Sequence, residues 1–227
     1  MFLAEEYMGQ LVAALRDNFS DRLLYVGLQG SYMRGEATES SDIDPVVIID
    51  HLSIDDLNIY RQIISNMESP EKSCGFICGS QELIRWNPLE ICHLLHSTKD
   101  LYGKLADLVP SCSREDVRNF AKLSVNNLYH EICHRYLHAS REQNAMHIAD
   151  AYKNVFFILQ NVYFLEKGIF ATTKMELKQY LNEADRKILD TAAVLKVGTP
   201  IPFDQAFLQL YGWCKDIMNK LSAEVME

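Results

Sequence analysis

Two apolar segments near the start of this chain are separated by a glycine–serine pair and two closely spaced aspartates. Residues 23–28 and residues 46–49 are the apolar segments, and between them the chain carries Gly30-Ser31 and Asp42-Ile43-Asp44. Short apolar runs bounded by turn residues are typical of buried strands. The pattern therefore predicts a strand–turn–strand unit whose polar residues serve one site.

These residue types suit a metal–triphosphate complex. Glycine lets the backbone close around a phosphate, and the Ser31 hydroxyl and neighbouring N–H groups can donate to phosphate oxygens. Asp42 and Asp44 lie two residues apart at a strand start, so their carboxylates point the same way and offer oxygen ligands to a divalent metal. The alternative is an ordinary turn at Gly30-Ser31 beside two solvated loop acids.

The wider motif resembles the signature of the DNA polymerase β-like nucleotidyltransferases. It reads Gly30-Ser31, then Arg34-Gly35, then Ser41-Asp42-Ile43-Asp44, in a strand–turn–strand context. Within that superfamily it is most similar to the minimal and the antibiotic-modifying nucleotidyltransferases. The resemblance implies that an acceptor hydroxyl attacks the α-phosphorus of a nucleotide bound with Mg²⁺ or Mn²⁺, and that pyrophosphate leaves. We expect ATP as the nucleotide and AMP as the transferred group.

The resemblance also implies a role for each motif residue. The aspartate pair would be catalytic metal ligands, and the glycine–serine turn would hold the β- and γ-phosphates. Arg34 would either contact phosphate or form an ion pair with Glu36 or Glu39, since exposed ion pairs are common. Lys174 and Lys178 share a face of a predicted helix and could reach the triphosphate, although solvated lysines are the more common outcome.

One part of the family pattern is missing. The family usually supplies a third carboxylate from the following strand, but residues 73–79 contain no acid. The chain could use one metal, take a general base from elsewhere, or bind nucleotide with weakened catalysis. A base from the first long C-terminal helix would be His130, Glu131 or His134, because a histidine near its ordinary pKa can accept a hydroxyl proton. The alternative is an ordinary polar helix face.

The acceptor follows from the resemblance alone. Antibiotic-modifying relatives favour a small molecule such as an aminoglycoside or a lincosamide. A protein partner, as in antitoxin-like minimal nucleotidyltransferases, is the second choice, and an inactive nucleotide-binding module is the third. Fold-level analogy cannot name the acceptor.

Two motifs in the C-terminal half point to other enzyme classes. His130-Glu131-Ile132-Cys133-His134 fits the His-Glu-x-x-His pattern of zinc peptidases, but that site needs a third ligand. His138 extends the row, although successive steps of four residues drift around a helix. Arg141 and His147 have a spacing found in HEPN ribonucleases, a helical fold that this half loosely resembles. We expect neither activity.

The composition limits which classes of binding partner are expected. The chain has a formal net charge of −9. Residues 1–110 hold 8 Lys or Arg against 17 Asp or Glu, and residues 111–227 hold 14 of each. Nucleic-acid affinity depends largely on basic residues, so a nucleic-acid partner is not expected. The scattered cysteines, the absence of a bilayer-length apolar run and an N-terminal segment unlike a signal peptide predict a cytoplasmic protein without membrane association. A monomer or homodimer is expected, but these features do not decide between the two.

The periodicity predicts an α+β chain of two domains. Residues 1–110 would be the nucleotidyltransferase catalytic domain, a small mixed sheet with helices on one side. Its expected elements are an amphipathic helix ending near Phe19, strands at 23–28, 46–49 and 74–79, a helix from Ser53 to near Pro70, and a short helix at 81–86 capped by Ser80. Residues 111–227 would be an all-α substrate or interaction domain, with helices at 113–139, 144–167, 174–181, 183–195 and 203–223.

Overall fold

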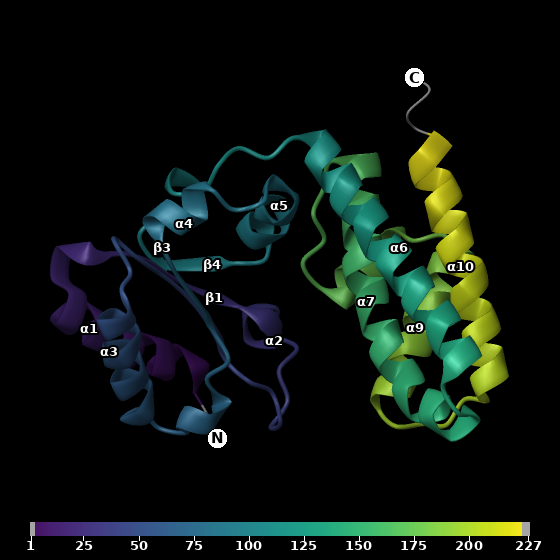
Figure 1. Ribbon diagram of the computed structural model, residues 1–227, viewed down its shortest axis with the longest axis horizontal. Helices are drawn as coiled ribbons and strands as arrows, with labels where there is room; N and C mark the ends of the chain where they lie inside the picture. The colour runs from purple at the N-terminus through teal and green to yellow at the C-terminus, as the bar shows by residue number, and fades with distance from the viewer. Residues whose placement is uncertain (1–2, 224–227) are drawn as a thin grey trace. The chain divides into compact units, whose positions relative to one another are not determined.

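The computed structural model describes residues 3–223 and confirms the α+β class. The chain divides into two compact units, Met1–Cys112 and Ser113–Glu227. The first unit contains the sheet, and the described part of the second, residues 113–223, has helices and no strand (Figure 1).

The sheet of the first unit has four strands in the order β3-β2-β1-β4. The strands are β1 (Leu23–Gln29), β2 (Asp44–Ile49), β3 (Phe76–Gly79) and β4 (Lys99–Tyr102). β1 pairs antiparallel with both β2 and β4, whereas β2 and β3 run parallel, so the sheet is mixed as predicted.

Helices cover both faces of this sheet, so the prediction of helices on one side was wrong. The unit's helices are α1 (Ala4–Phe19), α2 (Gly30–Met33), α3 (Ile54–Ser65), α4 (Ser80–Ile84) and α5 (Pro88–His96), with 3₁₀ turns η1 (Ser20–Arg22), η2 (Pro70–Lys72) and η3 (Leu105–Asp107). α1 and α3 pack against the face that includes Val26 and Val47. The face with Tyr25 and Val46 packs against α4, α5 and the chain after β4. Both faces are apolar, so both must be covered.

Several local predictions were corrected. α3 ends at Ser65 rather than near Pro70, and β3 begins at Phe76. The N-cap of α4 is Gly79 rather than the predicted Ser80, and it makes no side-chain capping bond. The Ser80 hydroxyl instead donates to Asp50 Oδ1 at 2.8 Å. α5 and β4 were not predicted.

An ion pair ties the start of α3 to the chain before β1. Arg22 donates to both carboxylate oxygens of Asp56, with N–O distances of 2.6 and 3.1 Å. Asp56 also completes a capping box with Ser53. The hydrogen bond from Arg22 is the main reason why the pKa of the buried Asp56 carboxyl lies well below its usual range.

Asp56→Asn is expected to lower the free energy of unfolding at pH 7 by about 1 kcal/mol, the scale of a lost capping interaction. A depressed pKa stabilises the fold above the unfolded-state pKa of about 3.9, and this stabilisation is lost as pH falls below it. The difference between wild type and variant in urea unfolding should therefore shrink from pH 7 to pH 3. Asp55→Asn, at the exposed neighbouring position, is the control. A difference that does not change with pH would contradict this account.

The second unit consists of helices that follow the prediction closely. They are α6 (Arg114–His138), α7 (Arg141–Lys167), α8 (Lys174–Tyr180), α9 (Glu183–Lys196) and α10 (Phe203–Ala223). α6 begins with a capping box formed by Ser113 and Asp116. α7 begins three residues before its predicted start, because Ser140 and Gln143 form another capping box, and it ends at Gly168 with φ of 69°.

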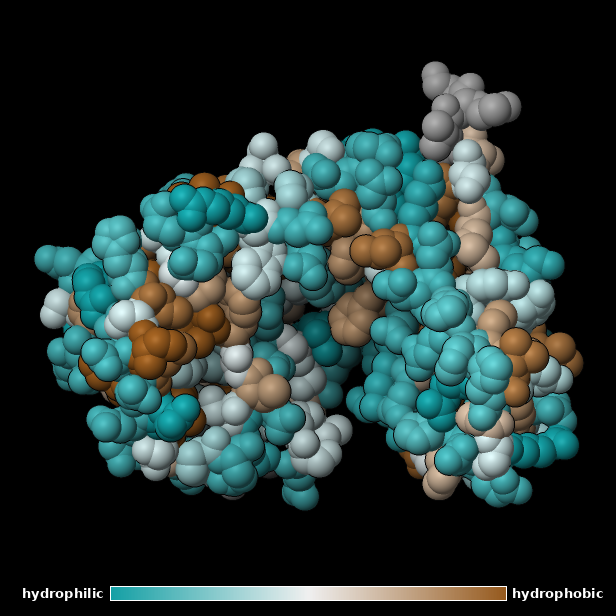
Figure 2. All heavy atoms as spheres, viewed as in Figure 1, coloured by the Kyte–Doolittle hydropathy of each residue, from teal (hydrophilic) through white to brown (hydrophobic). Residues whose placement is uncertain are grey.

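The face of the second unit visible in Figure 2 is mainly hydrophilic, with apolar residues in small separate patches. Among the described residues, no helix combines the length and apolar character that crossing a membrane requires.

Candidate active site

The end of β1 and the start of β2 bring the glycine–serine turn and the second aspartate together. The antiparallel register pairs Gln29 with Asp44. Gly30 follows with φ of 73°, a conformation that residues with a Cβ adopt at a cost. A Cβ at Gly30 would lie 1.8 Å from Asp44 Oδ2, so the carboxylate rests directly on the turn.

The residues after Gly30 fold back into a compact turn. α2 is a single helical turn, and Glu36 N–H donates to the Ser31 carbonyl at 2.9 Å. Ser31 is only partly exposed, in the first turn of this helix. The loop that connects the two strands therefore returns close to its own start.

Asp42 and Asp44 differ in their exposure to solvent. Asp42 is exposed and Asp44 is half-buried. Burial is the largest cause that raises the pKa of Asp44, the Asp42 carboxylate raises it further, and the nearby Arg34 lowers it. A divalent cation would offset both unfavourable contributions, so the two carboxylates fit Mg²⁺ or Mn²⁺.

Cys74, in the segment just before β3, is the residue in register with Asp44. β2 and β3 run parallel with Val46 opposite Phe76, and an isolated bridge pairs Ile43 with Ser73. Cys74 therefore lies level with Asp44, and its side chain is exposed. Within residues 3–223, no three His, Cys, Asp or Glu side chains gather as a metal site. The chain supplies two carboxylates here.

Arg34 lies near two carboxylates, those of Glu36 and Asp44. Its Nε donates to Glu36 Oε2 at 3.2 Å, so the predicted pairing with Glu36 is present. The Arg34 side chain is only 16% exposed, and its charge acts on Asp44 and on His93 of α5. Its contact with phosphate stays a prediction.

His93 of α5 is near enough to Arg34 for that charge to lower its pKa, although burial is the larger cause. The sequence gives no signal for this proximity, because it depends on the pairing of β4 with β1 after α5. Gln29 and Thr98 provide that link, with a hydrogen bond of 2.8 Å between Gln29 Nε2 and Thr98 Oγ1.

The histidine row of α6 lies in the second unit. His130, Glu131 and His134 are exposed, and the rings of His130 and His134 are 6.0 Å apart. The ring of His138 lies 4.7 Å from that of His134. No third ligand joins them in the described part of the chain, so the zinc-peptidase reading has no structural support.

The two lysines predicted to reach the triphosphate are engaged within the second unit. Lys178 forms an ion pair with Asp190 of α9. Lys174 Nζ lies 5.7 Å from the centre of the Phe156 ring. Both contacts fix α8 against its neighbours, and phosphate binding by these lysines stays a prediction.

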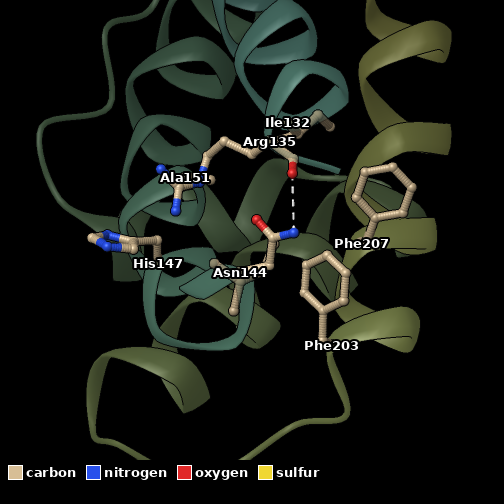
Figure 3. Close-up of a pocket in the computed structure, with 8 residues that line it drawn as sticks. Ile132, Arg135, Asn144, His147, Ala151, Phe203 and Phe207 are labelled. Atoms are coloured by element: carbon tan, nitrogen blue, oxygen red, sulfur yellow. Dashed lines mark hydrogen bonds between the residues drawn. The ribbon is translucent and has the colours of Figure 1, made fainter. Parts of the chain in front are cut away.

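Arg141 and His147 make contacts with different carboxylates. Arg141 forms an ion pair with Asp204 of α10, whereas His147 Nδ1 lies 3.5 Å from Asp150 Oδ2. His147 lines a small pocket whose residues are Ile132, Arg135, Asn144, Ile148, Ala151, Phe203 and Phe207 (Figure 3). Arg141 is not part of this lining, so the pocket does not support the arginine–histidine ribonuclease pair.

A comparison with protein families matches part of the first unit. Residues 8–74 match the family described as nucleotidyltransferase domain, a range that spans the turn and both aspartates. This segment is a nucleotidyltransferase domain. The resemblance to the polymerase β-like superfamily is thus confirmed for the segment that carries the motif, and the reaction class of the domain is nucleotidyl transfer. No sequence among curated proteins matches the chain.

Solved structures resemble more of the chain than this domain alone. The crystal structure of spectinomycin adenyltransferase AAD(9) from Enterococcus faecialis with ATP and spectinomycin has a TM-score of 0.59 at 16% identity, covering 96% of this chain and 99% of that chain. This likeness shows a shared fold across the nucleotidyltransferase domain and the helical unit.

Two further solved structures are similar to this chain at lower TM-scores, and we draw no conclusion from them. A toxin–antitoxin structure with AMP-PNP has a TM-score of 0.34 at 21% identity, covering 57% of this chain and 93% of that chain. The Elizabethkingia meningoseptica cyclic dinucleotide synthase CdnE with GTP and Apcpp has a TM-score of 0.32 at 16% identity, covering 96% and 91%.

Proposed function

We propose that this protein transfers AMP from ATP, bound with Mg²⁺ or Mn²⁺, to a hydroxyl group of a small molecule such as an aminoglycoside or a lincosamide. The observation that carries the proposal is the Asp44 carboxylate packed on the Gly30 turn, with Asp42 beside it, inside a nucleotidyltransferase domain. The fold shared with an adenyltransferase whose structure holds ATP and spectinomycin supports adenylate as the transferred group and a small acceptor.

Each residue of the turn has a role in this reaction. Ser31 and the backbone N–H groups beside Gly30 donate to the β- and γ-phosphates. Asp42 and Asp44 hold the metal, which when bound offsets charge on the phosphoryl oxygens. The acceptor oxygen forms a bond to the α-phosphorus, the bond to the pyrophosphate oxygen breaks, and the hydroxyl proton passes to a base.

The base is proposed among His130, Glu131 and His134, on the sequence pattern alone. If one of them accepts the proton, then His130→Ala, Glu131→Gln or His134→Ala should lower kcat by roughly 10²–10⁴-fold, the usual range for a general base. Binding of Mg–ATP, measured by calorimetry, should not change. His138→Ala, one turn further along α6, is the control. Full turnover in all three variants would contradict the proposal that one of these residues is the base.

Label transfer from α-³²P-ATP tests the proposed function. The protein is incubated with Mg²⁺, labelled ATP and a panel of aminoglycosides and lincosamides, and the products are separated by size and charge. Label on a small molecule supports the proposal. Label on protein would replace it with a protein acceptor. If no acceptor is labelled, the proposal of nucleotidyl transfer is overturned, and a nucleotide-binding module without transfer activity replaces it.

A further inference from the structure

The C-terminal part of α6 carries three exposed histidines, spaced four residues apart. The rings of His134 and His138 lie 4.7 Å apart, whereas the rings of His130 and His134 lie 6.0 Å apart. Among the described residues 3–223, none forms a hydrogen bond or an ion pair with these three imidazoles. Their nitrogens are therefore available to a ligand from solution, and the two neighbouring pairs differ in the distance between their rings.

The shorter separation is the one that two imidazoles on a single metal ion require. A metal–nitrogen bond of about 2.1 Å, together with about 1.1 Å from that nitrogen to its ring centre, places each ring centre roughly 3.2 Å from the ion. Bond angles at the metal between about 90° and 110° then separate the two ring centres by roughly 4.5–5.2 Å. His134 and His138 lie within this range. His130 and His134 would need an angle of about 140° at the metal, which neither square nor tetrahedral coordination provides.

The place of this pair in the helix and its ligand type both favour a transition-metal ion. His138 is the last residue of α6, and the C-terminal end of a helix carries partial negative charge that attracts a cation. Imidazole nitrogen suits Zn²⁺, Ni²⁺ and Cu²⁺, whereas Mg²⁺ prefers oxygen ligands. The Mg²⁺ of the proposed nucleotide site would therefore not compete for these two histidines.

We propose that His134 and His138 together chelate one divalent transition-metal ion of the group Zn²⁺, Ni²⁺ and Cu²⁺. In the described part of the chain no third His, Cys, Asp or Glu joins the pair, so water completes the coordination. The site is thus an open surface site, unlike the closed four-ligand sites of structural zinc. It does not depend on the proposed function, because no nucleotide takes part in the binding.

Calorimetric titration of chelator-washed, untagged protein with Zn²⁺ and with Ni²⁺ tests the inference. Every protein in the series carries Cys74→Ser, because that exposed thiol also binds these metals. We expect one ion for each chain. His138→Ala should weaken binding about tenfold or more, because a single imidazole then holds the ion. His134→Ala should weaken it to a similar extent for the same reason.

His130→Ala is the matched control, since it removes an exposed imidazole from the same helix one turn away from His134. Its Kd for Zn²⁺ and Ni²⁺ should equal that of the parent protein. A loss of affinity as large as that of His138→Ala would overturn the assignment to the pair His134 and His138. Parent protein that binds neither metal at concentrations up to about 1 mM would overturn the inference, as would undiminished binding in His134→Ala/His138→Ala.

The Cu²⁺ form gives a readout that counts the ligands directly. Pulsed electron paramagnetic resonance should detect two coordinated imidazoles in the parent protein and one in His138→Ala. A single coordinated imidazole in the parent protein would overturn the chelate. Thermal unfolding links the ion to the folded helix, because a ligand that binds only the folded state raises the thermal midpoint. Zn²⁺ should raise the midpoint of the parent protein more than that of His138→Ala, and equal shifts would contradict the proposal.

Discussion

Replacing Asp42 and Asp44 together by asparagine is expected to abolish magnesium-dependent ATP binding and to lower nucleotidyl transfer by about 10³-fold or more, because a bound metal contributes several kcal/mol of charge stabilisation. Neutral amides are poor ligands for a hard divalent cation. The stability of the fold is not expected to fall. The raised pKa of Asp44 shows that its ionised form is unfavourable in the folded state, so neutralising it should leave the thermal midpoint unchanged or higher.

Calorimetry with ATP, with and without Mg²⁺, measures the binding, and label transfer measures the reaction. Asp17→Asn makes the same chemical change at an exposed position of α1 and should alter neither. Magnesium-dependent binding that survives in the double variant would move the triphosphate away from the Gly30 turn. A large fall in the thermal midpoint would show that the two carboxylates support the fold.

Much of the first unit could be predicted because its signals are local. The apolar run after η1 and the positive-φ glycine specify β1 and the turn, and Ser53 with Asp56 specifies the start of α3. The start of α5 also had a local signal, since Asn87 caps it and Pro88 occupies its first turn. α5 is nevertheless absent from the elements predicted above.

Other features of the site have no local signal. β4 is four residues long and half of it is charged, Lys99 and Asp100 among Leu101 and Tyr102, so no alternation marks it as a strand. Its pairing with β1 is what brings the end of α5 to the turn. The covering of the second face was missed in part for the same reason, because α5 and the chain after β4 pack there beside the predicted α4.

Gly30→Ala is expected to disable the site through two separate effects. The first is conformational, because an alanine with φ of 73° costs about 1–2 kcal/mol of stability. The second is steric, because the new methyl group would lie 1.8 Å from Asp44 Oδ2 and must displace that carboxylate. A displacement of about 1 Å in a catalytic group can lower a rate roughly 10²-fold. We therefore expect a moderate loss of stability and a large loss of transfer.

Gly35→Ala separates the two effects within the same loop. Gly35 has φ of 68°, but a Cβ there would meet no atom within 4 Å. Urea unfolding should show a similar loss of stability for both variants, and label transfer should fall sharply only for Gly30→Ala. Equal activity in the two variants would mean that Asp44 does not need its place on the turn. Because the two glycines have similar φ angles, a difference in activity between the variants reports the contact between the turn and the Asp44 carboxylate.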